Sequence, residues 1–310
     1  MKRIALASCL LFASACGAPS ATDATVAQLR AAVPTRATLS IVPAATQVAT
    51  SPPDGAPACA ALRPSQFGTL THQIAGNADG VLGGVLGTVE AITQTPPAAS
   101  APGHAVWGPL ASPDGSIVHR LAVDAVSPDE IHFVLAGKPA AADESAWRGL
   151  FQGVTASPDA SHHAGQLAVD FGAVHALDPT SDPLAGNVGV HFEAAGDARN
   201  VTASFAGIQG ASAPAADDAQ YAFQQAADQS AGLAFSTRVD FDGSGALDEL
   251  AHIDSRWAAT GAGVAHLTVT GGSLGTGGAT AVECWDATLG RVFYTDSVGH
   301  NEGDPACCPN

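Results

Sequence analysis

Aromatic residues are scarce in this chain of 310 residues, of which they make up 5%. A membrane-spanning β-barrel needs a continuous apolar band and girdles of aromatic side chains, and two tyrosines and four tryptophans argue against one. A glycosidase places a pair of carboxylates at the scissile bond. It would normally also line its cleft with aromatic rings, and few are present. The shortage therefore disfavours both classes.

Basic residues are also few, with 12 lysines and arginines against 29 acidic residues and a formal net charge of −17. Nucleic acids are bound mainly through Lys and Arg contacts to phosphate. Anionic lipid surfaces attract clusters of the same residues. We therefore exclude nucleic acid as a partner and expect no polybasic contact with lipid. Strong acidity instead suits a soluble, exported domain.

Recognisable catalytic signatures are few. "GASAP" and "DGSGA" do not match G-x-S-x-G, and "GGSLG" at 271–275, which does, lies in a glycine-rich loop between expected strands and not at a strand-to-helix turn. No S-x-x-K stands in a suitable setting, and "GSLGTGG" lacks the Lys-Ser/Thr of a phosphate-binding loop. The 11 histidines form no H-x-H or H-E-x-x-H. His162 and His163 adjoin on an expected loop, while His175 and His191 fall in expected neighbouring strands, where a cross-strand pair could bind zinc or copper. We expect scattered polar-face histidines instead, and a non-enzymatic protein. A secreted or surface hydrolase with an unrecognised active site is the alternative.

The N-terminus carries a targeting segment. Lys2 and Arg3 precede the apolar run Ile4 to Phe12, which is too short to span a bilayer, and the small residues 13–15 follow. This order predicts a signal peptide over residues 1–15. The small residues end on Cys16, and the site resembles the lipobox of bacterial lipoproteins, although Ala13 stands where leucine is usual. Ordinary secretion with cleavage nearby is the alternative.

The lipobox resemblance implies that Cys16 becomes the N-terminus and carries acyl chains such as palmitate. Gly17 follows it, rather than the aspartate that signals inner-membrane retention in enteric bacteria. We therefore expect a cell-envelope lipoprotein whose membrane contact is its lipid anchor, in the outer membrane, on its periplasmic face or at the surface.

Four cysteines remain after Cys9 and Cys16 are set aside, an even number that suits disulfides in an oxidising compartment. A bond between the adjacent Cys307 and Cys308 would need a strained ring. We therefore expect Cys284 to pair with Cys307 or Cys308, and Cys59 to pair with the other. A zinc site is disfavoured because the chain has no C-x-x-C spacing.

Composition divides the rest of the chain into three parts. Residues 16–58 are rich in Ala, Pro, Thr and Ser and are expected to form a flexible tether. Residues 59–104 are expected to hold a helix and a proline-rich connection. Within them, apolar groups at 67, 70, 74, 81, 85, 89 and 92 keep to one helical face, which we expect to pack on a sheet. Glycines at 76, 80 and 84 weaken this helix.

Residues 105–310 show a period of two. Alternation recurs, with few helical patterns between, in the segments "SIVHRLAVDAV", "EIHFVLAGK", "QLAVDFGAVHAL", "GNVGVHFEA", "NVTASFAGI", "GLAFSTRVDF", "LDELAHIDSRW", "GVAHLTVTGG" and "RVFYTD". "APAADDAQ", with Asp217 and Asp218, is interpreted as a linker. The pattern predicts a mainly β fold: an antiparallel meander of roughly 10–12 strands, forming a large curved sheet or an open or closed barrel, with one N-terminal helix packed on it.

The stretch "VDFDGSGALDELAHI" places acidic residues close together at an expected hairpin. It resembles the D-x-[DN]-x-[DNS]-G-x-x-D calcium loops of FG-GAP repeats. The resemblance implies side-chain ligands from Asp240, Asp242, Ser244 and Asp248, and a carbonyl ligand from Ala246. Hard oxygen ligands on a turning backbone suit Ca²⁺. An Asp-Gly hairpin turn with acidic decoration is the alternative.

Motifs near the C-terminus carry a wider resemblance. "RW" at 256–257, "GAGVAHLTVTGG", "ECWD" at 283–286 and "RVFYTDS" follow in an order similar to that of a group of uncharacterised bacterial envelope lipoproteins. This resemblance implies location and fold but no activity. We expect a structural or ligand-binding domain, with an apolar ligand or an envelope protein as partner, because open barrels of many strands and one helix can cup apolar molecules.

Overall fold

The computed structural model describes residues 24–40, 59–156, 162–179, 185–209 and 217–309. The predicted signal peptide and the lipid-bearing Cys16 lie outside these residues. Among the described residues, none of the helices combines the length and the apolar character needed to cross a membrane.

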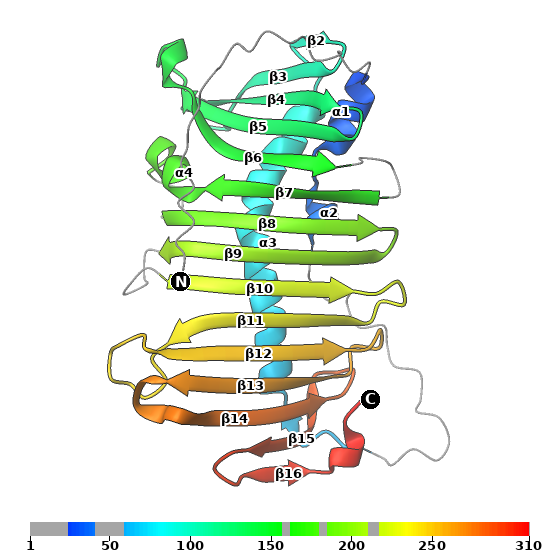
Figure 1. The fold of residues 1–310 in the computed structure, drawn as a ribbon, viewed down its shortest axis with the longest axis vertical. Helices are drawn as coiled ribbons and strands as arrows, with labels where there is room; N and C mark the ends of the chain where they lie inside the picture. Colours follow the sequence, from blue (N-terminus) through cyan, green and yellow to red (C-terminus); the bar gives the residue numbers. More distant parts are fainter. Residues whose placement is uncertain (1–23, 41–58, 157–161, 180–184, 210–216, 310) are drawn as a thin grey trace.

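Consecutive strands pair with one another along almost the whole chain (Figure 1). The described residues form a single sheet of sixteen strands in which neighbours are antiparallel, and the sheet does not close on itself. The strands are β1 (Arg63–Pro64), β2 (Ala99–Ala101), β3 (His104–Ala111), β4 (Ile117–Ser127), β5 (Glu130–Pro139), β6 (Arg148–Ala156), β7 (His162–Asp170), β8 (Ala185–Ala195), β9 (Ala198–Gln209), β10 (Asp217–Gln225), β11 (Ala231–Val239), β12 (Glu249–Trp257), β13 (Gly263–Gly271), β14 (Gly275–Trp285), β15 (Gly290–Asp296) and β16 (Asn301–Gly303). Only β1 leaves the sequential order, pairing with β15. The predicted mainly β meander is confirmed.

Sixteen strands exceed the predicted 10–12, and the extra ones lack clear alternation. β1, β2 and β16 have two or three residues each. In β6 the neighbouring Leu150 and Phe151 are both buried, because the register with β5 shifts at this point. β10 begins at Asp217, within the segment interpreted as a linker, and its buried side chains are Tyr221 and Phe223. The linker interpretation was wrong for residues 217–220.

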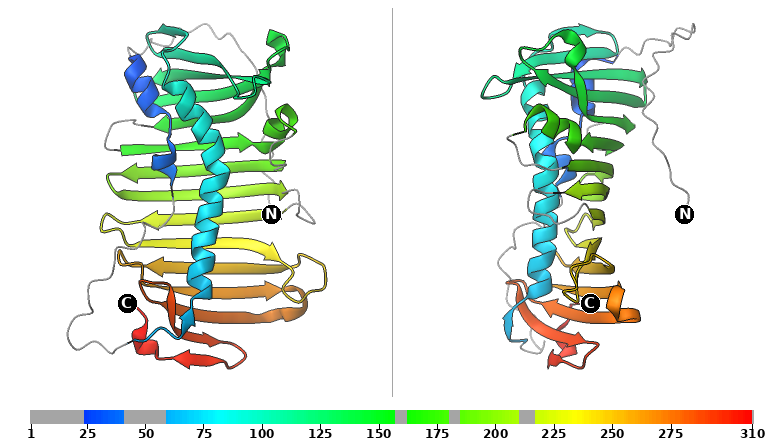
Figure 2. Two further views of the ribbon diagram at one scale, coloured as in Figure 1. Left: turned by 180° about the vertical axis from the view of Figure 1, so that it is seen from behind. Right: turned by 90° about the vertical axis from the view of Figure 1, so that its left-hand side faces the viewer.

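One long helix, α3 (Gln66–Thr93), lies across the strands on one face of the sheet, as the view from behind in Figure 2 shows. A helix of 28 residues is about 42 Å long. Its backbone approaches β13 and β14 at one end and β3 and β4 at the other. Nine strand spacings of about 4.8 Å separate β4 from β13, which gives about 43 Å. The length of the helix therefore matches the part of the sheet that it covers, and the predicted packing is confirmed.

The buried face of α3 combines small and large residues. The small ones are Gly68, Thr71, Ala75 and Ala78, and the large ones are Phe67, Leu82, Leu86, Val89 and Ile92. The expected apolar face was shifted, since Leu70 is 37% exposed and Ile74, Val81 and Val85 are only half-buried. Counting large apolar residues missed the small ones that let the helix approach the sheet. Across the interface, the sheet contributes Trp107, Phe133, Phe151, Phe223 and Trp285, so the few aromatic rings gather in this core.

Three further α-helices occur among the described residues. α1 (Val26–Ala32) and α2 (Arg36–Leu39) lie within the segment expected to be a tether. They bury Leu29, Ala32 and Leu39 on the same side of the sheet as α3, so this portion belongs to the folded domain. α4 (Phe171–Leu177) follows β7 directly and begins at the side chain of Asp170, which accepts a hydrogen bond from the Ala173 N–H at 2.8 Å. His175 therefore lies on a helix and not on the strand that alternation suggested.

The first turn of α3 is held by a carboxylate of the sheet. Glu283 in β14 is fully buried, and its Oε1 accepts hydrogen bonds from the Phe67 N–H at 3.0 Å and from the Ser65 hydroxyl. Its other oxygen forms an ion pair with Arg291 of β15, which is 1% exposed. Arg291 also reaches Gln66 at 3.2 Å and Glu302 at 3.3 Å. A negative charge at a helix N-terminus is stabilising, because it is attracted to the positive end of the helix dipole.

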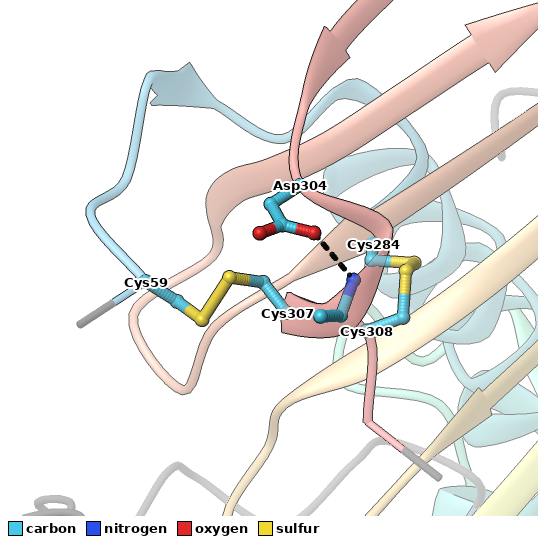
Figure 3. The surroundings of a disulfide bond; sticks show 6 residues. Cys59, Cys284, Asp304, Cys307 and Cys308 are labelled. Atoms are coloured by element: carbon cyan, nitrogen blue, oxygen red, sulfur yellow. Dashed lines mark hydrogen bonds between the residues drawn. A yellow bond between two sulfur atoms is a disulfide. The ribbon is translucent and has the colours of Figure 1, made fainter. Parts of the chain in front are cut away.

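Two disulfides close the same end of the molecule (Figure 3). Cys284 in β14 is bonded to Cys308, and Cys59 is bonded to Cys307. The prediction that Cys284 pairs with one of the terminal cysteines, and Cys59 with the other, is confirmed. The short 3₁₀ helix Pro305–Cys307 brings both terminal cysteines into place, with Asp304 accepting a hydrogen bond from the Ala306 N–H at 2.9 Å. A loop of 24 residues closed by Cys284 and Cys308 stabilises the fold by about 3 kcal/mol in the chain-entropy model.

Replacing Gly80 with alanine should stabilise the domain. A Cβ at Gly80 would meet no atom within 4 Å, and alanine removes a penalty of up to about 1 kcal/mol for glycine in a helix. We expect a melting temperature about 2–4 °C higher by calorimetry. Gly68→Ala is the control, because its Cβ would lie 2.8 Å from the Ser65 hydroxyl and 3.1 Å from the Trp285 ring. A gain from Gly68→Ala, or a loss from Gly80→Ala, would contradict this packing.

Removing the charge of Glu283 should be costly. Glu283→Gln leaves the buried Arg291 without its buried partner, a change that typically costs about 3–5 kcal/mol. Urea unfolding followed by circular dichroism measures the loss. Glu302 is a second partner of Arg291, and its own side chain is 40% exposed. Glu302→Gln should therefore lower the free energy of unfolding by at most about 1 kcal/mol. Equal losses in the two variants would refute the anchoring role of Glu283.

Candidate metal centre

The acidic stretch singled out in the sequence forms the connection between β11 and β12. Val239 and Glu249 are opposite each other in the register, so residues 240–248 leave the sheet as one loop. Gly243 and Gly245 adopt positive φ values of 73° and 88°, which residues with side chains rarely adopt. These two glycines allow the loop to turn twice within a few residues.

Backbone N–H groups of the loop hold its carboxylates. Asp240 Oδ2 accepts a hydrogen bond from the Gly245 N–H at 2.9 Å, and Asp242 Oδ1 accepts one from the Ser244 N–H at 2.9 Å. The Ser244 hydroxyl accepts a weaker bond from the Ala246 N–H at 3.3 Å. Such local side-chain bonds are typical of Asp and Ser in turns, and they place the carboxylates without any ion.

Glu249 completes a group of three acids. Oxygen atoms of Asp240, Asp242 and Glu249 all lie within 4.8 Å of one another. Glu249 is fully buried, and its Oε2 accepts a hydrogen bond from the Phe241 N–H at 3.1 Å. Its Oε1 is also buried and has no hydrogen-bond partner among the residues that the structure describes. A buried carboxylate oxygen without a partner costs free energy unless a cation or a donor compensates it.

A second connection encloses the group. The β13–β14 connection lies beside the β11–β12 loop at the same end of the strands (Figure 1), because Gly271 is opposite Glu249 in the register. Gly272 has a φ of 50°, and a Cβ at this position would overlap Glu249 Oε1. A hydrogen bond from the Ser273 side chain lowers the pKa of Asp242, and hydrogen bonds from the backbone and side chain of Ser244 lower it further. Asp242 is therefore ionised at neutral pH.

The structure brings together part of the predicted ligand set. Asp240 and Asp242 belong to the group of acidic side chains, whereas Asp248 is exposed and does not. The predicted Ser244 hydroxyl and Ala246 carbonyl ligands stay predictions. Glu249 stands in the place expected for Asp248. The sequence did contain a signal for Glu249. Every second residue of β12 points to the helix side of the sheet, and Glu249 is the first in this row, before Ala251, Ile253, Ser255 and Trp257. A glutamate at the start of a buried row needs a partner.

The histidines gather no comparable site. Across the described ranges, the acidic group is the one cluster of three or more His, Cys, Asp and Glu side chains close enough to hold a metal ion. His162 Nε2 lies 3.4 Å from Glu193 Oε1, His175 is on α4 and His191 is on β8. Isolated histidine pairs of this kind offer too few ligands for zinc or copper.

A serine and a histidine do meet on the face of the sheet opposite α3. Ser236 Oγ lies 2.7 Å from His252 Nδ1 across β11 and β12. In the described part of the chain, His252 has no hydrogen bond to a carboxylate that would orient it as a general base. A hollow of about 950 Å³ lies nearby on β10–β13, and its lining holds the Asp254–Arg256 ion pair but no histidine or cysteine. The arrangement gives little support to the hydrolase alternative.

No protein-family model, no curated protein and no solved structure matches the chain. The resemblance to bacterial envelope lipoproteins therefore stays a prediction from the sequence.

Proposed function

We propose that this chain is a non-enzymatic protein of the bacterial cell envelope, anchored by lipid at Cys16, whose sheet is a structural scaffold that binds one calcium ion. The ion is held by Asp240, Asp242 and Glu249. The observation that carries the calcium proposal is Glu249: its buried Oε1 has no hydrogen-bond partner among the described residues, and one of its oxygens lies within 4.8 Å of oxygens of two further carboxylates.

Calcium fits this group better than other common ions. Ca²⁺ takes six to eight oxygen ligands in flexible geometry, and carboxylates supply the strongest of them. Mg²⁺ demands stricter geometry, and Zn²⁺ favours Cys and His, which are missing from the group. Three carboxylates this close repel one another when no cation is bound, so a divalent ion relieves the repulsion and compensates the buried oxygen.

A bound ion would serve the structure rather than a reaction. It would join the β11–β12 loop to the first residue of β12. Gly272 and Ser273 of the β13–β14 connection lie close to this point, beside Glu249 and Asp242 respectively. The two connections lie side by side at one end of strands β11–β14. Calcium would therefore join the loops at the ends of these strands, in addition to the contacts that α3 makes with β13 and β14.

The envelope location is supported by the leader, the acidic composition and the disulfides. Cys59–Cys307 and Cys284–Cys308 require an oxidising compartment. Residues 1–15 supply an export signal, and Cys16 stands where a lipoprotein is acylated.

Calcium should raise the thermal stability of the purified chain. A ligand that binds only the folded state at a hundredfold excess over its Kd stabilises that state by about 2.7 kcal/mol. This corresponds to a rise of roughly 5–10 °C in Tm. We expect this rise between EDTA and about 10 mM calcium, because loops of this kind in extracellular proteins bind with Kd near 10⁻⁴ M. Calorimetry with and without the ion measures it, and an unchanged melt would refute the calcium proposal.

Two substitutions at neighbouring positions test whether Glu249, found in the structure, or Asp248, expected from the sequence pattern, is the calcium ligand. Glu249→Gln keeps an acceptor for the Phe241 N–H but removes the charge, and we expect it to abolish the calcium-dependent rise in Tm. Asp248→Asn, at an exposed position outside the group, should leave the rise unchanged. The opposite result would assign the site to Asp248 and not to Glu249.

The lipid anchor can be tested by labelling. A bacterium that expresses the full chain and is fed alkyne-palmitate should yield a labelled protein in its membrane fraction. Cys16→Ser should lose the label and appear in the soluble fraction. Cys9→Ser, which changes a cysteine inside the predicted signal peptide, should remain labelled. Label retained in Cys16→Ser would show that Cys16 is not the acylated residue.

A further inference from the structure

A pocket lies between α3 and the sheet, and it shares no lining residue with the acidic group of the β11–β12 loop. It measures about 240 Å³. Its walls are mainly apolar: Ile74 and Val81 come from α3, while Phe205, Ile208 and Phe235 come from β9 and β11. The polar lining residues are Asn77, Asp217 and Tyr221. The five apolar residues are half-buried, unlike the large residues that face the helix elsewhere in the core. The side chains of the described residues therefore do not close this part of the helix–sheet interface.

The pocket exists because small residues face each other across the middle of the interface. The α3 backbone approaches the sheet at its two ends, at β13–β14 and β3–β4. Between these ends the facing positions Ala78 on α3 and Ala219 on β10 both line the pocket. Two alanines leave a space that larger side chains would fill. A dry apolar cavity of about 150 Å³ can hold benzene, so this pocket can hold a somewhat longer molecule.

Within the described residues, one polar group of this region has no hydrogen-bond partner. Tyr221 lines the pocket from β10 and is 3% exposed, and its hydroxyl makes no hydrogen bond to any of these residues. Buried tyrosine hydroxyls normally find a partner, and an unsatisfied one calls for an explanation. Burial, and then the charge of Asp79, raises the pKa of Tyr221, so the hydroxyl stays protonated as a donor.

Nearby charges decide what kind of molecule fits. Asp217 lines the pocket and receives a hydrogen bond from the Thr237 hydroxyl, and Asp79 is close enough to act on the Tyr221 hydroxyl. Two carboxylates disfavour an anionic ligand such as a fatty acid. A ligand here needs an apolar chain for the walls and an uncharged oxygen that accepts the hydrogen bond of Tyr221.

We infer that this pocket binds one neutral alkyl molecule that carries a hydroxyl, ether or carbonyl oxygen, with Tyr221 as the hydrogen-bond donor. The ligand replaces the contacts that Ala78 and Ala219 leave unmade and satisfies the hydroxyl. This site is separate from the calcium centre, so the two proposals can fail independently.

Isothermal titration of the full chain with 1-octanol tests the inference, and it is run in calcium and in EDTA. We expect saturable binding of one molecule per chain in both. Octanoate at pH 8 should bind at least about tenfold more weakly, because the carboxylates repel it. Tyr221→Phe keeps the ring but removes the donor, and it should weaken octanol binding about fivefold to tenfold.

Filling the pocket provides the second arm. Ala219→Leu should abolish octanol binding without lowering Tm, since the added side chain occupies existing space. Ala222→Leu, on the opposite face of the same strand, is the matched control and should bind octanol like the unaltered chain. The inference is overturned if the unaltered chain does not bind octanol, if Ala219→Leu binds it equally well, or if Tyr221→Phe shows no loss.

Discussion

The carboxylate of Glu283 is the point where the helix and the sheet are joined. It accepts the Phe67 N–H of the first turn of α3 and pairs with Arg291 on the next strand, and all of these contacts are buried. A helix that crosses nine strand spacings must start in the correct place, because an error there displaces every later contact. Ser65, Glu283 and Arg291 set that starting point by charge and hydrogen bonds rather than by apolar packing, which would tolerate sliding.

The motifs at the C-terminus acquire physical roles from this junction. In "ECWD", Glu283 holds the helix, Cys284 forms a disulfide, Trp285 packs beneath Gly68 and Asp286 accepts the N–H groups of the following turn. In "RVFYTD", Arg291 pairs with Glu283, and the ring of Tyr294 contacts both Arg291 and Phe67. These motif residues therefore dock the helix on the sheet, a structural role that indicates no activity.

Alternation with a period of two was enough to predict the meander, and the steps of three and four were enough to predict α3. Local patterns could not predict which residues of distant segments come into contact. Ala78 and Ala219 read as unremarkable small residues, yet their opposition creates the pocket. Glu249 follows the predicted calcium loop directly, but its burial depends on Gly272, which is 23 positions later in the chain. The parts of both sites that were missed arise from contacts between distant segments, for which a single sequence holds no period.

An open sheet of this size has to avoid pairing with other chains through its edges. The outermost strands answer this by being short: β2 and β16 have three residues each and β1 has two, so each offers few unpaired backbone groups. Both disulfides lie at the β1–β16 end and hold the tail against it. A net charge of −17 adds repulsion between copies. Short edges, crosslinks and charge together let one helix-backed sheet stay open without closing into a barrel.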